Sequence, residues 1–364
     1  MKEDKKTLYS KIVQDLIENI EKGEMVKGQK LPTEKELMEY YNVSRITAKR
    51  ALEELKNMGL IYRKKGHGSF LNENASKQEI YKQKFISMIL PYENSSGRFI
   101  DYIKGASDYL YSKGYFLSVN CTDGDEFKEK EYITKMSSAG AKGIIYYPAK
   151  NMNNFDILYL LYTKKYPIVT IDKYFDSLPI SYAVSDNFGG GYELCKYLIE
   201  LCHKKIAFIS SIDISSASSV RERFLGYVKA LKDSNINIDD NVVINGYLKH
   251  ENYDLIKICK KLYDCGVTAI ICENDFIALD ILKSLNVQGI NVPNDISLAG
   301  FDNVPVLQQM DIELTTIEQD FYEIGKKAAE LVIEYIEREG GIQKKAVIPV
   351  KLIKRKSIKN ILKG

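Results

Sequence analysis

This sequence has little histidine, no paired cysteines and no long apolar run. Its 364 residues include 3 His and 6 Cys, and the cysteines fall at irregular intervals without a Cys-x-x-Cys pair. Few imidazoles and no ligand spacing argue against a metal site and against histidine-based catalysis. We therefore expect no metal, no cofactor and no catalytic residues, and we expect the cysteines to be reduced and partly buried.

Apolar stretches that could enter a membrane are also missing. No segment approaches the roughly 20 apolar residues of a membrane helix, and none follows the polar start from Met1 to Lys6. This pattern predicts no signal peptide, no membrane partner and a cytoplasmic protein.

Charge is divided unevenly along the chain. Residues 1–71 contain 15 of the 52 Lys/Arg and 11 of the 49 Asp/Glu, a net charge of +4. The remaining 37 basic and 38 acidic residues give a net charge of −1. A basic head on a near-neutral body predicts that only the head seeks a polyanion. We expect a domain over residues 1–71, a polar linker over 72–83 and a body of one or two lobes over 84–364.

Two short helices are predicted within the head. Thr33 and Glu36 have the spacing of a capping box, and this helix breaks near Asn42. Ser44 can cap a second helix, which Gly59 closes. Behind Ser44, one apolar stripe at i, i+3, i+4 and i+7 predicts a buried helix face. Its members are Ala48, Ala51, Leu52 and Leu55.

Basic residues gather on the second of these helices and on the hairpin that follows it. Residues 60–63 and 69–71 can pair as two strands around Gly66-His67-Gly68. Between Ser44 and Gly68 there are seven Lys/Arg and two acids. This arrangement is typical of a winged helix-turn-helix that enters the major groove. An ordinary helical domain with a solvated charged face is the alternative, and the order of the motifs argues against it.

Residues 7–71 resemble the winged helix-turn-helix domain of GntR-type regulators. The shared features are a first helix with Leu8, Ile12, Leu16 and Ile20, then Leu-Pro-Thr-Glu-Lys-Glu-Leu at 31–37, Val-Ser-Arg at 43–45 and the glycine wing. The resemblance implies one monomer on each half of a palindromic DNA operator. We expect the following residues to contact DNA: Lys35, Ser44, Arg45, Thr47, Lys49, Arg50 opposite the buried stripe, and His67 and Gly68 at the wing tip.

In the body, short β-branched runs alternate with amphipathic stretches. Strands are predicted at 85–90, 115–119, 143–147, 167–171, 205–209, 267–271 and 296–300. Strands of this composition with helical connections indicate an α/β fold with parallel sheets. About 280 residues exceed what one sheet usually needs, so we expect two doubly wound lobes with a ligand at the carboxyl ends of the strands.

Polar residues follow several of these strands. Asp172, Asn274 and Asp302 come directly after predicted strands, and Arg223 lies early in a helix after another strand. Carboxylates, an amide and a guanidinium near aromatic rings suit a polyhydroxylated ligand. Each residue alone has a simpler explanation, because Asp and Asn at strand ends commonly cap the next helix.

Residues 84–364 resemble the effector domain of lactose-repressor-type regulators, which is similar to periplasmic sugar-binding proteins. The matching motifs lie at 223–227, 274–279, 292–303 and 314–319. The resemblance implies that Arg223, Asn274 and Asp302 hydrogen-bond the effector, that Asp172 does so from the other lobe, and that Phe321 lies near the pocket. Tyr92 and Tyr147 are further candidates, for which core or rim packing is an equal alternative.

The pairing of these two domains resembles arabinose-responsive repressors. It implies a homodimeric repressor that leaves a palindromic operator when L-arabinose or a related sugar binds. Tyr147-Pro148 and Asn303 depart from the expected pattern and leave the sugar open. The alternative is a regulator of the same architecture for another sugar or metabolite, including one that needs its ligand as a corepressor.

Two other functional classes compete with a regulator, a freestanding sugar-binding protein and a nucleotide-dependent enzyme. The head and the predicted absence of a signal peptide argue against the first. Gly189-Gly190-Gly191 resembles a phosphate loop, but it lacks the Gly-Lys-Ser/Thr ending and the dinucleotide spacing. Glycines that ease a chain crossing near a helix N-terminus are a sufficient explanation of the run, so we do not expect phosphate binding.

Overall fold

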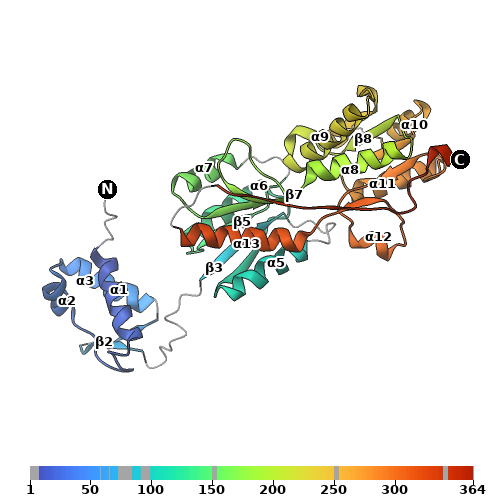
Figure 1. The fold of residues 1–364 in the computed structure, drawn as a ribbon. Helices are drawn as coiled ribbons and strands as arrows, with labels where there is room; N and C mark the ends of the chain where they lie inside the picture. The colour runs from blue at the N-terminus through green and yellow to red at the C-terminus, as the bar shows by residue number, and fades with distance from the viewer. Residues whose placement is uncertain are drawn as a thin grey trace. The chain divides into compact units, whose positions relative to one another are not determined.

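The computed structural model describes residues 8–57, 59–64, 66–72, 84–91, 99–149, 154–249, 254–338 and 343–363. The chain divides into two compact units, Met1–Lys84 and Phe85–Gly364 (Figure 1).

The first unit packs three helices against a small hairpin. The helices are α1 (Leu8–Glu21), α2 (Glu34–Tyr41) and α3 (Arg45–Asn57); the strands are β1 (Ile61–Lys64) and β2 (Gly68–Leu71). The two strands pair antiparallel. The predicted stripe on α3 is buried, since all four of its members are at most 2% exposed. In α1 the expected apolar face is shorter than predicted, because Leu8 is 61% exposed while Ile12 and Leu16 are buried.

Local hydrogen bonds fix the turn between α2 and α3. Thr33 accepts from the backbone N–H of Glu36, and the Glu36 carboxylate accepts from the backbone N–H of Thr33, which completes the predicted capping box. Asn42 ends α2 with a left-handed backbone at φ 49°. The hydroxyl of Ser44 then accepts from the N–H of Thr47 at 3.2 Å. Each helix boundary in this turn therefore has a local cause that the sequence reveals.

The second unit begins with a lobe built on a six-stranded sheet. The strand order is β13-β7-β6-β5-β3-β4, and every neighbouring pair is parallel. These strands are β3 (Phe85–Leu90), β4 (Phe116–Cys121), β5 (Gly143–Tyr146), β6 (Ile168–Ile171), β7 (Ser181–Ser185) and β13 (Lys345–Ile348). One face packs on α5 (Phe99–Ser112) and α13 (Phe321–Glu337). The other face packs on α6 (Glu126–Ser138) and α7 (Phe155–Thr163).

The second lobe has a four-stranded parallel sheet of order β11-β10-β8-β9. These strands are β8 (Ile206–Ser210), β9 (Val243–Asn245), β10 (Ala269–Cys272) and β11 (Ser297–Ala299). One face packs on α8 (Asn187–Glu200) and α9 (Ser218–Asp233). The other packs on α10 (Leu255–Asp264), α11 (Asp275–Val287) and α12 (Pro305–Gln309). Short 3₁₀ turns are η1 (Ile214–Ser216), η2 (Asp240–Val242), η3 (Tyr247–Lys249) and η4 (Ile361–Lys363).

The chain passes three times between the two lobes. It crosses after β7, after β12 (Thr316–Glu318) and after β13, and β14 (Lys351–Ile353) then pairs antiparallel with β12. The predicted two doubly wound lobes are confirmed. The strands that the sequence did not predict are β7, β9, β12, β13 and β14.

Candidate functional site

In the head, one carboxylate connects the second helix to both elements that are predicted to read DNA. Glu34, in the first turn of α2, accepts from Arg45 Nε of α3 at 3.2 Å and from Arg63 Nη2 of β1 at 3.1 Å. Arg45 stays 79% exposed in this pair. An exposed ion pair of this kind stabilises the fold little. Its consequence is geometric, because it limits the directions in which the Arg45 guanidinium points.

Three further residues that are predicted to contact DNA, Lys35, Lys49 and Arg50, interact with other side chains of the head. Lys35 and Lys49 form exposed i,i+4 pairs with Glu39 and Glu53, which DNA phosphates can replace at small cost. Arg50 is exposed as predicted, but its guanidinium lies 4.1 Å from the ring centre of Tyr9 on α1. That contact ties Arg50 to the head's own first helix.

The wing tip is made possible by two glycines. Gly66 and Gly68 have φ values of 78° and 105°, which side chains with a Cβ rarely adopt. Between them, His67 is exposed and its N–H donates to the Lys64 carbonyl. Gly68 shares a groove of about 590 Å³ with Lys35 and Arg45, between α2, α3 and the hairpin.

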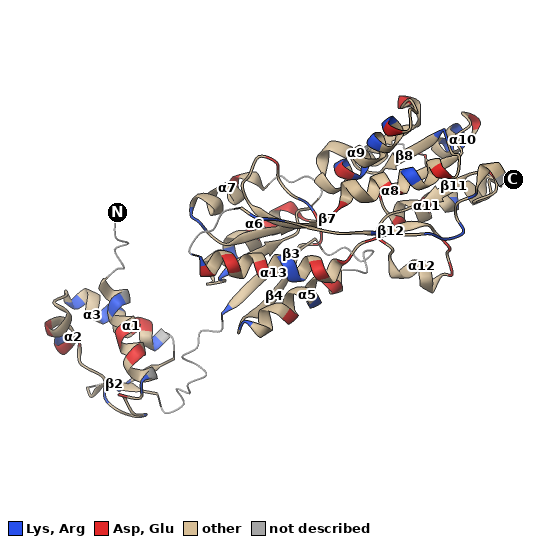
Figure 2. Cartoon of the chain, in the orientation of Figure 1, with Lys and Arg blue, Asp and Glu red and all other residues tan. Residues whose placement is uncertain are grey.

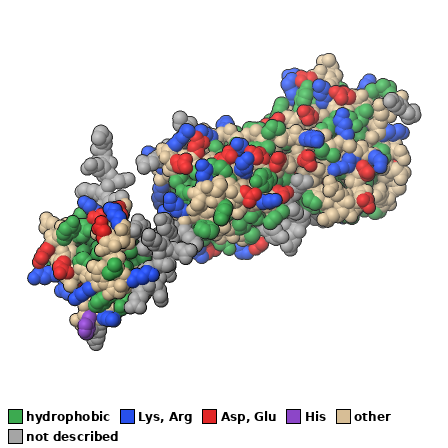
Figure 3. Space-filling model, turned by 60° about the horizontal axis from the view of Figure 1, so that its bottom comes forward, with side chains coloured by type: hydrophobic (Ala, Val, Ile, Leu, Met, Phe, Trp, Pro, Cys, Tyr) green, Lys and Arg blue, Asp and Glu red, His purple; other side chains and the backbone are tan. Residues whose placement is uncertain are grey.

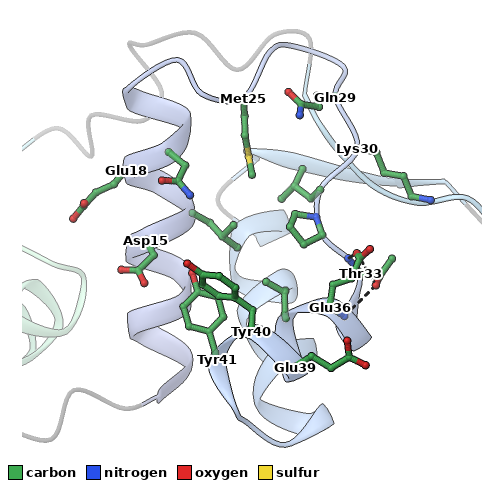
Figure 4. A pocket seen from close by; sticks show the side chains of 15 residues that line it. Asp15, Glu18, Met25, Gln29, Lys30, Thr33, Glu36, Glu39, Tyr40 and Tyr41 are labelled. Atoms are coloured by element: carbon green, nitrogen blue, oxygen red, sulfur yellow. Dashed lines mark hydrogen bonds between the residues drawn. The ribbon is translucent and has the colours of Figure 1, made fainter.

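A larger hollow of about 1040 Å³ lies between α1 and α2 (Figure 4). Asp15, Glu18, Glu36 and Glu39 line it, with Lys30 as the one cation among the lining residues. Four carboxylates repel a phosphate backbone, so this hollow does not suit DNA. The backbone N–H and the side chain of Thr33 lower the pKa of the Glu36 carboxyl, which keeps that charge in place.

In the second unit, a cavity of about 580 Å³ is lined by residues from both lobes. It brings together six of the seven predicted effector residues. Tyr147, Asp172 and Phe321 come from the first lobe, and Arg223, Asn274 and Asp302 come from the second. Tyr92 lies outside the described residues.

Arg223 is the most constrained of these side chains. It is 6% exposed, and its guanidinium stacks 3.8 Å from the centre of the Phe301 ring. Its Nε donates to Asn187 Oδ1 at 2.8 Å, and its Nη1 donates to the backbone carbonyl of Glu273 at 2.6 Å. Its Nη2 lies 3.4 Å from Asp302 Oδ1. These contacts hold the Arg223 guanidinium in one fixed orientation at the cavity wall.

The backbone is unusual at both aspartates. Asp172 and Asp302 have φ values of 66° and 110°, in the left-handed region that favours glycine. Such conformations cost about 1–3 kcal/mol each and gather at ligand sites. Asn274 behaves differently, because its side-chain oxygen caps α11 by accepting from the N–H of Ile277. The capping alternative therefore holds for Asn274, and its amide nitrogen is the group left for a ligand.

Two buried charges in the cavity were not predicted from the sequence. Lys173 is 9% exposed, donates to the Pro148 carbonyl at 2.9 Å and lies 5.0 Å from the Tyr147 ring centre. Glu273 is 3% exposed and accepts from the hydroxyls of Ser210 and Ser211. Lys173 directly follows Asp172 and Glu273 directly precedes Asn274, and both of these neighbours were predicted because they follow strands. Including one more residue on either side would have found Lys173 and Glu273.

Tyr102 was also missed, because it lies within a helix and follows no strand. Its ring packs edge to face on Phe321 at 5.0 Å and lies 6.1 Å from the Tyr147 ring. The side chain is 2% exposed, and its hydroxyl has no hydrogen-bond partner among the described residues. Burial raises the pKa of this phenol, with Asp172 as the next contribution, so the group is a neutral donor. A buried donor without a partner at a cavity wall is suited to a ligand oxygen.

Asp275, which follows Asn274 in the second lobe, stabilises the backbone next to the cavity. It is fully buried, and its carboxylate accepts from the N–H of Val304 at 2.9 Å and from Thr316 Oγ1 at 2.6 Å. Burial, and then the charge of Asp302, raise the pKa of Asp275 to about 7. These bonds hold the backbone that follows Asp302.

The glycine run has a packing role. A Cβ on Gly191 would lie 2.2 Å from the Arg223 carbonyl oxygen, so the run lets α8 and α9 pack closely. His203 is buried between Thr268 and the Lys359 carbonyl, and burial lowers its pKa. Within the described residues, no group of three His, Cys, Asp or Glu side chains could hold a metal ion. Among the same residues no helix is long and apolar enough to span a membrane.

Comparisons with known proteins agree with this geometry. Residues 8–71 match the family described as bacterial regulatory proteins, gntR family, and residues 195–358 match the periplasmic binding protein-like domain. The chain is 30% identical over 343 residues to an arabinose metabolism transcriptional repressor of Halalkalibacterium halodurans, covering 92% of this chain and 90% of that one. It is 28% identical to the repressor of the same name from Geobacillus stearothermophilus, covering 93% of each.

Solved structures give the same assignment for the second unit. The transcription regulator CcpA of Lactococcus lactis superposes with a TM-score of 0.67 at 25% identity, covering 76% of this chain and all of that one. The predicted resemblance of both domains is confirmed. The chain belongs to the family of transcriptional repressors that join a GntR-type DNA-binding head to a periplasmic-binding-protein-like domain of the lactose-repressor type, and it is not an enzyme.

Proposed function

We propose that this repressor controls genes of sugar use and that L-arabinose, or a closely related sugar, is its effector. The repressor binds a palindromic operator as a homodimer, with one head on each half-site, and the sugar releases it. The names of the two relatives that align over nine-tenths of the chain support the choice of sugar.

The observation that carries the proposal is the composition of the cavity between the lobes. Asp172 and Asp302 supply acceptors from opposite lobes, Arg223 supplies paired donors, and Phe321 and Tyr102 supply ring surfaces. Sugar hydroxyls need acceptors and donors, and the C–H faces of a pyranose need aromatic surface. A volume of about 580 Å³ lies within the range of small-molecule sites.

A ligand held in this way changes the equilibrium between open and closed lobes. It contacts both lobes only when they are close, so its affinity is higher for the closed state. Closure moves the two lobes of each monomer and, through the dimer, the spacing of the two heads. Heads with altered spacing no longer fit two half-sites at once.

The test is a gel shift of the operator with and without sugars, together with a thermal-shift panel of pentoses and hexoses. We expect L-arabinose to raise the melting temperature, because it binds the folded state by mass action, and to release DNA. If another sugar gives the larger stabilisation, that sugar replaces L-arabinose. If the stabilising sugar tightens DNA binding, the sugar acts as a corepressor and not as an inducer.

A further inference from the structure

The N-terminal ends of the first-lobe strands share one edge of the sheet, and lysines follow that edge. Phe85 pairs with Phe116 at the start of β3 and β4, and the N–H of Lys142 donates to the Phe85 carbonyl. The Tyr166 hydroxyl, next to β6, donates to the Ala141 carbonyl. Residues just before these strands therefore lie near one another. The lysines before β3, β4, β5 and β6, which we call the lysine face, are Lys84, Lys113, Lys142, Lys164 and Lys165. Lys344, which precedes β13, is paired with Glu334 and is not included.

All five lysines are exposed to solvent. In the described part of the chain, no ion pair involves Lys113, Lys142, Lys164 or Lys165. One acid near this face is the exposed Glu337, at the end of α13, whose charge acts on Tyr115 just before β4. Figure 3 shows basic side chains gathered at this end of the second unit, and Figure 2 marks one where β3 begins.

A local explanation exists for part of this pattern. Lys113 and Lys164 directly follow α5 and α7, and cations are favourable at helix C-termini. That effect does not explain Lys142 and Lys84, which precede strands. Nor does it explain why exposed lysines collect on one face of a body whose net charge is −1.

The lysine face is also where the chain enters from the head. Lys84 immediately precedes β3, and Asn72 ends the described part of the head, so twelve peptide links join them. Such a connection spans at most about 40 Å. Once the head is on DNA, this face is confined near the same duplex at a high effective concentration, so even weak phosphate contacts become significant.

We propose that the lysine face is a second DNA-binding surface, which contacts the phosphate backbone of the operator duplex without reading its sequence. The head then supplies specificity and the effector domain supplies additional electrostatic affinity. Because the face belongs to the first lobe, movement of that lobe changes these contacts directly. This surface is distinct from the winged helix-turn-helix and from the sugar cavity.

The test uses the full-length protein and two charge-matched variants. One is K142Q/K164Q/K165Q on the lysine face. The control is K196Q/K204Q/K232Q, which removes three exposed second-lobe lysines that also make no ion pair with described residues. Binding to a fluorescent operator duplex and to a random-sequence duplex of equal length is measured by anisotropy over a series of salt concentrations.

A plot of log Kobs against log salt has a negative slope, which becomes shallower by about 0.9 for each phosphate that the protein no longer neutralises. The dimer carries six substituted lysines, so we expect the slope of the lysine-face variant to be shallower by up to about 5, and its affinity near 0.1 M salt to be at least about tenfold weaker on both duplexes. The control should keep the wild-type slope. Melting temperature and sugar binding should match the wild type, which separates a weakened DNA surface from misfolding.

Two results would overturn the proposal. One is an unchanged slope in the lysine-face variant. The other is an equal weakening in both variants, because it would reflect net charge alone. A duplex trimmed to the half-sites gives a second readout. Trimming should lower the DNA affinity of the wild type and leave the DNA affinity of the lysine-face variant unchanged.

Discussion

Arg223 Nη2 lies 3.4 Å from Asp302 Oδ1, within a cavity that both lobes line. The pair joins a helix residue to a strand-end residue 79 positions later, so it exists only after the second lobe has folded. Arg223 is fixed by Asn187 and by the Glu273 carbonyl, which leaves Asp302 with a defined position as well. We therefore expect Asp302 to transmit ligand occupancy to the second lobe.

Asp302→Ala should yield a repressor that stays on DNA when sugar is added. A hydrogen bond to a charged group contributes about 1.5–3 kcal/mol, so sugar affinity should fall at least tenfold. Isothermal calorimetry measures the affinity, and a gel shift measures retention on the operator. Asp264→Ala, at an exposed carboxylate of the same lobe, is the control and should remain inducible. If Asp302→Ala is fully inducible, the ligand lies elsewhere.

Tyr102→Phe should separate ligand binding from folding. The Tyr102 hydroxyl is buried and has no partner in the described structure, so removing it should not lower the free energy of unfolding. If that hydroxyl binds the sugar, affinity should fall about threefold to tenfold, as expected for one neutral hydrogen bond. Tyr227→Phe is the matched control, because the Tyr227 hydroxyl donates to the Ile206 carbonyl inside the core. The control should lose stability and keep its intrinsic sugar affinity; equal sugar affinity in Tyr102→Phe and wild type would remove Tyr102 from the site.

Local sequence patterns accounted for much of the head and for part of the cavity. The capping box at Thr33, the break at Asn42 and the glycine wing are each determined by residues a few positions apart. The rule that polar residues follow parallel strands located Asp172, Asn274 and Asp302. Such signals need no knowledge of the rest of the chain.

Features that depend on distant pairing were not predictable in this way. The pairing of β13 with β7 joins residues about 160 positions apart, and neither strand is a long β-branched run. Tyr102 enters the cavity because α5 packs beside α13, a contact that helix periodicity in one segment does not reveal. The interaction of Arg50 with Tyr9 likewise depends on how α1 crosses α3.

Arg45→Ala should weaken specific DNA binding by about 1–3 kcal/mol if Arg45 contacts a base, and sugar binding should not change. The effect should be seen against the operator and be small against a random duplex. Lys56→Ala, which removes an exposed cation from the last turn of the same helix, is the control and should affect both duplexes slightly and equally. If Arg45→Ala lowers both affinities by the same factor, Arg45 contacts the backbone and another residue reads the sequence.

Asp275→Asn should flatten the pH dependence of stability. Burial, and then Asp302, raise the pKa of Asp275 to about 7, whereas an unfolded Asp titrates at about 3.9. Between these two pH values Asp275 is protonated in the native state and ionised in the unfolded state. Its contribution to the free energy of unfolding is therefore fully present below about pH 4 and is lost as the pH rises through about 7. Urea unfolding at pH 5, 6, 7 and 8 should therefore show wild-type stability falling relative to Asp275→Asn.

Two further effects act on the unfolding free energies of wild type and Asp275→Asn, and neither changes the direction of the expected pH trend. The Asp275→Asn variant has a pH-independent cost of about 1–3 kcal/mol, because the amide has one oxygen and can accept from only one of the two donors, the Val304 N–H and the Thr316 hydroxyl. Burial lowers the pKa of His203 and adds an opposite trend, which is common to both proteins and cancels in the difference. Asp295→Asn is the control, because its exposed carboxyl has a pKa lowered by Asn291 and titrates below this range. Parallel curves for wild type and Asp275→Asn would mean that Asp275 is ionised throughout.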